Sequence, residues 1–396
     1  MNRRILALLL ALVMVAGLMT GCASGKQETA APETAQTESP AAEETTAEPE
    51  QTEEVPAEEE APAEPETVSF TDSLGRTVEL PADITRIAPS GAVATMILAA
   101  IAPECMVTIN AAPSESQMAF LPANLAALPE TGQMYGSKAD LNLETLLAAD
   151  PQVVIDLGDK KGDMTEGLDA LQAQIGIPVV FIEADLAHMA AAFRTLGGLL
   201  SGKSDRGEEL AALVDRTTAM AEENAAKITD DMRVRAMYTT GEDGLGTNAA
   251  GSMQAQVLDM VGVENAVVVE DVSNKGGGNI ISLEQLYNFD PDVILFADGS
   301  IYDTVADDSA WSQLTAISTG RYYEVPGSPY SWLSGPPSMN MILGVWWLGN
   351  LIYPEIYDYD METMTQELYT TLWGYELSSE EVTALLGNST LKVATQ

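Results

Sequence analysis

The sequence predicts an α/β fold with two lobes, each a mostly parallel sheet flanked by helices, joined by a long rigid helix. Apolar strand-like runs alternate with helical stretches along the chain. One segment occurs twice, as NLETLLAADPQVVID at residues 142–156 and SLEQLYNFDPDVILF at residues 282–296. Between the two copies, residues 204–227 carry Leu210, Val214 and Ala221 on one apolar stripe and would span about 36 Å as a helix.

The repeated segment predicts the same structure in both copies. Asn142 and Ser282 are capping residues that open a short helix, and Ser282 forms a capping box with Gln285. The pairs Asp150-Pro151 and Asp290-Pro291 end the helices, because proline cannot continue them. The apolar run after each pair is typical of a buried parallel strand.

We expect the folded body to divide into four parts: a first lobe at 67–200, a linker helix at 201–230, a second lobe at 231–350, and C-terminal helices at 351–396 that pack back on the body. Two lobes are expected because about 330 residues exceed what one core usually holds. The first lobe has a predicted hairpin at 68–80, strands at 86–88, 106–110, 153–155 and 179–182, and helices at 92–101 and 164–175. The remaining elements are helices at 186–200, 204–227, 253–261, 338–350 and 363–372, and strands at 234–238, 293–296 and 322–325.

The N-terminus has the features of an export signal. Arg3 and Arg4 precede an apolar run at 5–19 that is too short for a membrane span with these flanks, which predicts a signal peptide over residues 1–21. The residues before Cys22 resemble a bacterial lipobox, in which the cysteine is lipidated after cleavage. We therefore expect an extracytoplasmic protein held at the cell membrane by a lipid on Cys22.

Residues 22–66 predict a disordered acidic linker. Residues 23–66 contain fourteen glutamates and no aromatic residue, so this segment cannot bury a core. The whole chain has a formal charge of −42, of which residues 67–396 carry −31. A body this acidic excludes general electrostatic binding to nucleic acid or to an anionic membrane face.

Little in the sequence favours catalysis or a resident metal. His188 is the one histidine, and we expect it to pack on an apolar helix, while Cys105 is expected to be a buried small hydrophobe. The serine-hydrolase elbow and the zinc-protease motif do not occur. We therefore predict no enzyme and no cofactor, although a pair of cleft carboxylates in a secreted carbohydrate-active enzyme remains an alternative.

The stretch GGLLSGKS at residues 197–204 matches the phosphate-binding P-loop pattern. That motif requires a buried strand before it and a helix after it. Helix-forming residues precede it here, so we interpret the pattern as the junction between two helices and not as a nucleotide site.

Residues 67–353 resemble the solute-binding lipoproteins of ABC importers, in the class that carries iron-siderophore, haem and cobalamin ligands. The resemblance is carried by DSLGR at 72–76, RIAPS at 86–90, the first repeat copy, and PPSMN at 336–340, where Gly335 departs from the usual charged or polar residue. It implies a cleft between the lobes, modest closure on ligand, a permease partner and a monomer. The helix at 92–96 lacks the glutamate that many members use for docking, so no docking residue is assigned.

The cleft residues follow from the rule that ligands bind beyond the carboxyl ends of parallel strands. The loops so chosen include 132–138 and 273–279, which precede the two repeat helices and should therefore face each other. The candidate ligand-binding residues are Ser90, Gly91, Tyr135, Ser137, Lys138, Thr247, Asn248, Tyr330, Trp332 and Ser338.

Two of these choices have open alternatives. Tyr330 and Trp332 either line the cleft or cap the core beneath their loop, and Lys138 either pairs with an anionic ligand group or is simply solvated. The leading hypothesis is capture of a chelated metal compound for an ABC importer. A bare oxyanion such as molybdate or tungstate, held by helix N-termini and Lys138, is the alternative within the same class.

Overall fold

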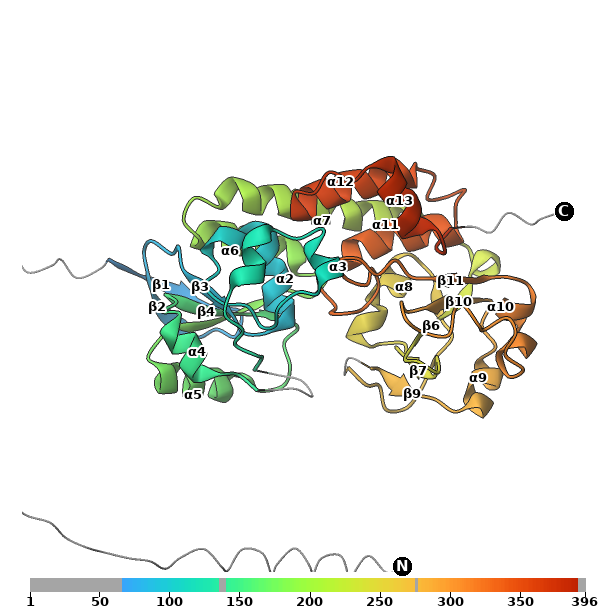
Figure 1. The fold of residues 1–396 in the computed structure, drawn as a ribbon, viewed down its shortest axis with the longest axis horizontal. Coiled ribbons are helices and arrows are strands. Elements are labelled where there is room, and N and C mark those ends of the chain that lie inside the picture. Colours follow the sequence, from blue (N-terminus) through green and yellow to red (C-terminus); the bar gives the residue numbers. More distant parts are fainter. Residues whose placement is uncertain (1–65, 135–139, 275–276, 391–396) are drawn as a thin grey trace, which may run out of the picture. The chain divides into compact units, whose positions relative to one another are not determined.

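The computed structural model describes residues 66–134, 140–274 and 277–390. The described residues belong to one compact unit, Ala63–Gln396. The predicted signal peptide, Cys22 and the acidic linker lie outside the described residues. The unit is mixed α/β, with a three-stranded sheet and a two-stranded hairpin in one lobe and a six-stranded sheet in the other (Figure 1), so the predicted fold class is confirmed.

The N-terminal lobe begins with the predicted hairpin, β1 (Thr67–Thr71) and β2 (Thr77–Pro81). Its turn is closed by Asp72, whose Oδ1 accepts the main-chain N–H groups of Leu74 and Arg76 at 3.0 Å each. Gly75 has φ +81°, a conformation that glycine adopts without steric cost. The hairpin is attached to the main sheet because the Ser73 N–H donates to the carbonyl of Phe181 at 3.0 Å.

The sheet of this lobe is parallel and has the order β3-β4-β5. The strands are β3 (Ile87–Pro89), β4 (Val153–Gly158) and β5 (Val179–Glu183), and the helices are α2 (Ala92–Ile101), α3 (Glu115–Met118), α4 (Leu143–Ala148), α5 (Thr165–Ile175) and α6 (Met189–Leu199). The strand expected at 106–110 does not form. Met106 and Ile109 make only isolated bridges, to Ile87 and Glu130.

The C-terminal lobe has a six-stranded sheet with the order β11-β10-β6-β7-β9, and β8 also pairs with β6. The strands are β6 (Arg235–Thr240), β7 (Gly246–Thr247), β8 (Glu264–Asn265), β9 (Asn279–Ile280), β10 (Val293–Phe296) and β11 (Tyr322–Glu324), and the helices are α8 (Gln256–Met260), α9 (Leu283–Phe289) and α10 (Thr315–Ser318). The strands β6, β10 and β11 are parallel, whereas β7 and β9 form an antiparallel extension.

The two copies of the repeat fold as the sequence predicts. The Asn142 side chain accepts the N–H of Thr145 at the start of α4, and Ser282 forms a capping box with Gln285 at the start of α9. The strands that follow, β4 and β10, are fully buried, and each lies between two parallel neighbours in its own sheet. Each copy therefore supplies the central parallel strand of one lobe.

The long helix between the lobes is α7 (Ser204–Ala225), which has 22 residues and packs along α6. Close approach of α6 and α7 requires glycine, because a Cβ on Gly207 would lie 2.6 Å from the carbonyl oxygen of Phe193. The P-loop-like stretch at residues 197–204 begins inside α6, which is helical through Leu199. Its Lys203 forms an ion pair with Glu104. The structure thus has a helix where a nucleotide site needs a strand.

The C-terminal helices are α11 (Met341–Ile352), α12 (Met361–Trp373) and α13 (Ser379–Leu386). They pack back on the body, with α11 against α7 and α8 and α12 against α2 (Figure 1). Arg206 of α7 joins these parts, because its guanidinium donates to the carbonyls of Ala100 in α2 and Thr371 in α12, at distances down to 2.6 Å. Within the described part of the chain, none of the helices combines the length and apolar character that a membrane span needs.

Candidate functional site

One wall of a cavity between the lobes, called here the interlobe cavity, begins where β3 ends. Ser90 directly follows β3, and its hydroxyl donates to Oδ1 of the buried Asp156 on β4 at 2.5 Å. Next come Gly91 and the first turn of α2, and all of these residues line the cavity. The first N–H groups of a helix have no partner within the helix, so this turn presents donors to a ligand.

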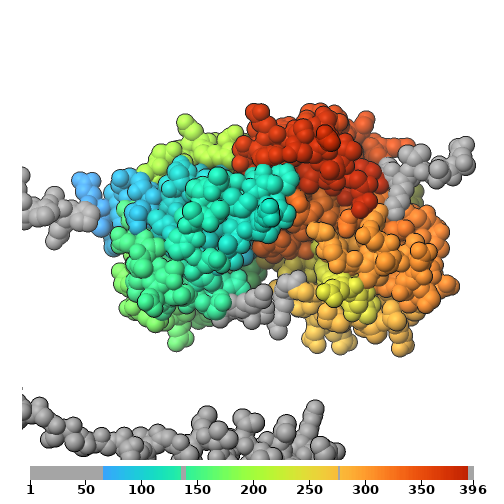
Figure 2. Space-filling model, viewed as in Figure 1, coloured from blue at the N-terminus to red at the C-terminus, as the bar shows by residue number. Residues whose placement is uncertain are grey.

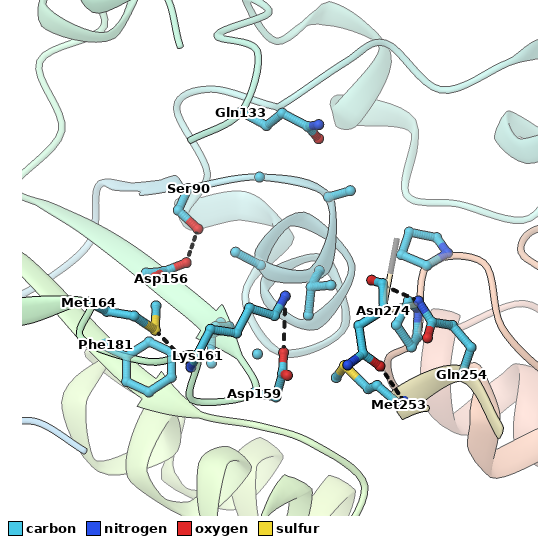
Figure 3. A pocket seen from close by; sticks show the side chains of 18 of the residues that line it. Ser90, Gln133, Asp156, Asp159, Lys161, Met164, Phe181, Met253, Gln254 and Asn274 are labelled. Atoms are coloured by element: carbon cyan, nitrogen blue, oxygen red, sulfur yellow. Dashed lines mark hydrogen bonds and ion pairs between the residues drawn. The ribbon is translucent and has the colours of Figure 1, made fainter. Parts of the chain in front are cut away.

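The loop after β4 supplies the charged groups of the cavity. The ammonium group of Lys161 lies 3.1 Å from the carboxylate of Asp159, and its side chain is 57% exposed. Asp163 also lines the cavity, and its carboxylate accepts the N–H of Thr165 at 3.2 Å. Met164 and Phe181 add apolar surface on the same wall (Figure 3). Charge in this wall is therefore concentrated in one short segment.

Gln133 lies against the turn that follows β3. The N–H of Met134 donates to the carbonyl of Ser90 at 2.9 Å, which fixes the segment beside that turn. A Cβ on Gly91 would lie 3.2 Å from Cβ of Gln133, so glycine allows this close approach. The Gln133 carboxamide is one of the polar groups around the cavity (Figure 3).

The opposite wall comes from the C-terminal lobe and contains no charged side chain among the described residues. It consists of Met253, Gln254, Asn274 and residues 334–337. The Gln254 side chain is 3% exposed, and its Nε2 donates to the carbonyl of Asn274 at 3.2 Å (Figure 3). Its Oε1 is buried and has no hydrogen-bond partner within the described structure. The hydrogen bond from Nε2 therefore holds Gln254 against the Asn274 segment of this wall.

The interlobe cavity has a volume of about 640 Å³. Its lining is mainly small or apolar, from Ala92, Val93, Ala94, Met164, Phe181 and the prolines of residues 334–337. Figure 2 shows that the surface is indented between the two lobes, on the side away from the C-terminal helices. A volume in this range is typical of pockets for small organic molecules and cofactors.

The fold and cavity agree with a comparison to known families. Residues 98–329, more than half of the chain, match the model of the family described as periplasmic binding protein. The chain belongs to this family. Such periplasmic binding proteins are extracytoplasmic and deliver ligands to the permeases of ABC importers.

Solved periplasmic binding proteins have the same architecture. An ABC transporter solute-binding protein from Sulfurospirillum deleyianum is 28% identical and superposes with a TM-score of 0.74. The match covers 81% of this chain and 99% of that protein. A periplasmic solute-binding protein from Veillonella parvula is 24% identical, with a TM-score of 0.68, and the match covers 82% of this chain and 98% of that protein. The molybdate-bound MolA of Haemophilus influenzae is 20% identical, with a TM-score of 0.63, and the match covers 78% of this chain and 99% of that protein. No curated protein sequence matches this periplasmic binding protein.

Two of the predicted ligand-binding residues are found at the cavity of this periplasmic binding protein. Ser90 and Gly91 line it. Of the loops before the two repeat helices, the described residues Gln133 and Asn274 belong to its lining. Tyr135, Ser137 and Lys138 lie outside the described residues, so their assignment stays a prediction.

Other predicted residues are placed away from the cavity lining. Thr247, Asn248 and Ser338 are buried in the C-terminal lobe, with exposed fractions of 0%, 1% and 2%. The Thr247 hydroxyl donates to the carbonyl of Tyr238 at 2.7 Å, which ties β7 to β6. None of the three belongs to the cavity lining.

The prediction that Trp332 lies at the cleft surface is wrong. Trp332 is completely buried, with its ring centroid 6.4 Å from that of Tyr369, and it does not line the cavity. Tyr330 is half-buried against the same core, and burial raises the pKa of its phenol to about 12. The loop is pressed onto α11, because a Cβ on Gly344 would clash with the carbonyl of Trp332. Core packing, the second of the two alternatives, therefore accounts for Trp332.

Sequence reasoning missed the segment 156–163 and the residues Met253 and Gln254. The signal for the first was available, because the loop after β4 lies beyond the carboxyl end of a central parallel strand. Gln254 was harder to find, since it lies in a short 3₁₀ turn at Met253–Ala255 that the sequence reads as part of a helix.

The sole histidine also differs from expectation. The His188 ring is 50% exposed and its Nδ1 lies 2.7 Å from Oδ1 of Asp185, so it does not pack in the core. Together with Glu183 these residues bring three possible metal-ligand atoms within 4.8 Å of one another. They are not in the cavity lining. Cys105 is buried as expected, and burial raises the pKa of its thiol.

Proposed function

We propose that this protein captures a chelated metal compound outside the cytoplasmic membrane and delivers it to the permease of an ABC importer. The observation that carries the proposal is the cavity of about 640 Å³ lined from both lobes. A bare tetrahedral oxyanion has roughly the bulk of four water molecules, on the order of 120 Å³. An organic complex matches the space better, since pockets of about 300–1,000 Å³ hold drug-sized ligands.

The chemistry of the lining supports the same choice over a bare oxyanion. Such an anion needs a tight polar site with compensating positive charge. The one cation among the described lining residues, Lys161, is already paired with Asp159. Apolar side chains and prolines cover most of the remaining wall, which suits a ligand with an organic shell around its metal.

Among chelates, a complex that brings all its own metal ligands fits best. Haem iron in proteins is held by an axial histidine, cysteine, methionine or tyrosine. The described lining offers Met164 and Met253 for this purpose, and no histidine, tyrosine or cysteine. A siderophore or corrinoid complex needs no such axial ligand from the protein.

A carbohydrate-active enzyme is the alternative from another class. Such enzymes place two carboxylates on either side of the scissile bond. In the described lining, Asp156, Asp159 and Asp163 all come from one segment of one lobe, and the facing wall is neutral. This arrangement favours binding over glycosidic cleavage.

Attachment to the cell membrane is part of the proposal. A lipid on Cys22, followed by an acidic linker of more than forty residues, would hold the folded body at the membrane without restricting the cavity. The protein would act there as a monomer.

Native mass spectrometry of protein purified from its own host tests the proposed cargo. The expected result is a protein mass increased by that of an organic metal complex. On denaturation, both this additional mass and the isotope pattern of the metal should disappear from the protein signal. A molybdate or tungstate adduct, or an oligosaccharide, would replace this proposal with one of the two alternatives.

A further inference from the structure

We propose that Glu183, Asp185 and His188 form a binding site for a divalent transition-metal ion, separate from the interlobe cavity. One possible ligand atom from each side chain lies within 4.8 Å of the other two, and none of the three residues lines the cavity. An ion at this site is held by side chains of the protein and is distinct from the cargo. The inference therefore goes beyond the proposed function and does not depend on it.

The backbone brings the three side chains together where β5 ends and α6 begins. Glu183 is the last residue of β5, and its N–H donates to the hydroxyl of Ser73 at 3.0 Å. His188 directly precedes α6, and its N–H donates to Oδ1 of Asp185 at 2.9 Å. The segment that carries the ligands is therefore held in place by main-chain hydrogen bonds before any ion binds.

The three side chains provide a mixed set of nitrogen and oxygen ligands. An imidazole combined with carboxylates suits Cu²⁺, Ni²⁺ and Zn²⁺, whereas Ca²⁺ and Mg²⁺ prefer sites made of oxygen alone. His188 is the sole histidine of the chain, so the one imidazole available to a metal lies beside these two carboxylates. The ligand set therefore indicates a transition metal, which a purely acidic cluster would not.

The charges around the two carboxylates point to a cation independently of the ligand types. Among the described residues, no lysine or arginine forms an ion pair with Glu183 or Asp185. The Asp185 side chain is only 19% exposed, and Glu183 is also partly buried. A partly buried carboxylate is stabilised by a nearby positive charge, which a divalent ion supplies here.

The spacing of the ligand atoms favours a tetragonal or octahedral ion. Nδ1 of His188 lies 2.7 Å from Oδ1 of Asp185. With metal–ligand distances of about 2.1 Å, donors at this spacing subtend an angle of about 80° at the ion. This angle is nearer to the value of about 90° in tetragonal and octahedral sites than to the tetrahedral value of about 109°. We therefore expect Cu²⁺ and Ni²⁺ to bind more tightly than Zn²⁺.

A bound ion connects the end of β5 to the start of α6. The ion takes the place of the proton between Nδ1 of His188 and Asp185, and the neutral imidazole keeps its proton on Nε2. Because the His188 ring is 50% exposed, the remaining positions of the ion are open to water. Such an open site is weaker than a closed four-ligand zinc site, and we expect a Kd on the order of 1–100 µM.

The test titrates Cu²⁺, Ni²⁺, Zn²⁺ and Ca²⁺, as simple salts, into the full chain purified without a histidine tag. A pH of about 7.5 keeps an imidazole largely neutral and able to bind metal. We expect Cu²⁺ to bind most tightly, followed by Ni²⁺ and Zn²⁺, and Ca²⁺ not to compete with them. The electron paramagnetic resonance spectrum of the first equivalent of Cu²⁺ should show one imidazole nitrogen ligand, which must belong to His188.

Matched variants assign the ion to these residues. His188→Gln should weaken Cu²⁺ binding at least about thirtyfold and remove the nitrogen signal. Glu183→Gln should weaken it about threefold to tenfold, because one carboxylate ligand is lost. Glu144→Gln removes the same charge from an exposed position of α4 in the same lobe, and should change the affinity by less than about twofold. Asp185 is left unchanged, because its Oδ1 also accepts the N–H of His188.

Thermal melts separate loss of the site from loss of the fold. Without metal, the three variants should melt close to the wild type, because each substituted side chain is at least partly exposed. An excess of Ni²⁺ should raise the melting temperature of the wild type and of Glu144→Gln by about 2–5 °C, and that of His188→Gln much less. If His188→Gln does not fold, Glu183→Gln decides the question.

The proposal is overturned if the wild type and His188→Gln bind Cu²⁺ equally, or if the bound Cu²⁺ has no imidazole nitrogen ligand. Equal affinities of Glu183→Gln and Glu144→Gln would also overturn it, because a histidine–aspartate pair would then account for the binding. None of these measurements uses the cargo. Failure of the proposed function and failure of this metal site are therefore observed separately.

Discussion

Asp150 and Asp290 adopt the same left-handed backbone conformation at equivalent points of the two repeats, with φ of 49° and 30°. They are the only two non-glycine residues with positive φ in the described chain. Each ends a repeat helix and precedes a proline that leads into a central strand. Aspartate adopts this conformation more readily than most non-glycine residues.

The two aspartates differ in their side-chain contacts, and this predicts different costs of substitution. The Asp290 carboxylate accepts both the N–H and the hydroxyl of Thr315, at 2.9 and 2.8 Å. The Asp150 carboxylate has no hydrogen-bond partner in the described structure. Asp290→Ala should therefore lose about 1–3 kcal/mol more unfolding free energy than Asp150→Ala, measured by chemical denaturation. Equal losses would show that backbone strain alone sets the cost.

Trp332→Ala is expected to destabilise the protein without changing the affinity of folded protein for its ligand. The Trp332 side chain is completely buried and lies outside the cavity lining. Removing a buried tryptophan typically costs about 3–5 kcal/mol. A thermal melt of the ligand-free protein, together with a titration at low temperature, measures both quantities.

Trp332→Phe serves as the control for this prediction. It keeps most of the buried apolar surface, so the loss of stability should be smaller. Weaker ligand binding in Trp332→Ala with an unchanged melting temperature would contradict the core assignment and return this residue to the cleft.

Cys22→Ala should release the protein from the membrane fraction and leave ligand affinity unchanged. The physical reason is that the lipid on Cys22 is proposed as the anchor, and the acidic linker separates it from the folded body. Fractionation of cells with detection of the protein measures the release. Retention of the variant in the membrane fraction would disprove the lipid anchor.

The His188 imidazole should titrate above its usual range. The hydrogen bond that the His188 ring donates to Asp185 raises the pKa of His188, although partial burial works in the opposite direction. Since this is the sole histidine of the chain, its ring resonances can be followed directly by NMR. Asp185→Asn should lower the pKa toward about 6.5. An unchanged pKa in this variant would exclude Asp185 as the cause.

The same shift predicts how stability depends on pH. A histidine whose pKa is raised on folding stabilises the protein fully below its unfolded pKa of about 6.5 and loses this contribution as pH rises through the folded pKa. The wild type should therefore exceed Asp185→Asn in stability most at acid pH, and the difference should shrink above neutrality. The effect is expected to be small because the ring is half exposed.

Much of the fold could be predicted because local signals agreed with tertiary structure. The helix at Ala92–Ile101 has the predicted bounds, and the repeat's caps at Asn142 and Ser282 are observed. The failure at residues 106–110 has a physical cause. This segment makes only one bridge to Ile87, through Met106. Its apolar side chains are buried, but its backbone is irregular and does not extend the sheet.

The cavity was less predictable than the fold. Loops such as 132–138 and 273–279 followed from topology, but which side chain turns into the cavity depends on packing that no local pattern records. Trp332 illustrates this point, because an aromatic residue in a loop rich in proline and glycine proved to be an internal anchor. The charged segment 156–163 was overlooked because its aspartates and lysines are also typical of a solvated turn.

The central claim is that the interlobe cavity holds the cargo, and a cavity-filling substitution tests it most directly. Gly167 of α5 lines the cavity, and a Cβ placed there meets no atom within 4 Å. Gly198 of α6 has equally open space and lies outside the lining. Both positions are helical, so replacing glycine should not weaken either helix.

The decisive measurement is the affinity of Gly167→Trp and Gly198→Trp for the co-purifying metal complex, by calorimetric titration. We expect Gly167→Trp to lose at least about tenfold in affinity, or about 1.4 kcal/mol, because the indole occupies cavity volume. Gly198→Trp should bind as the wild type does. Undiminished binding by Gly167→Trp, with its melting temperature unchanged, would contradict the account.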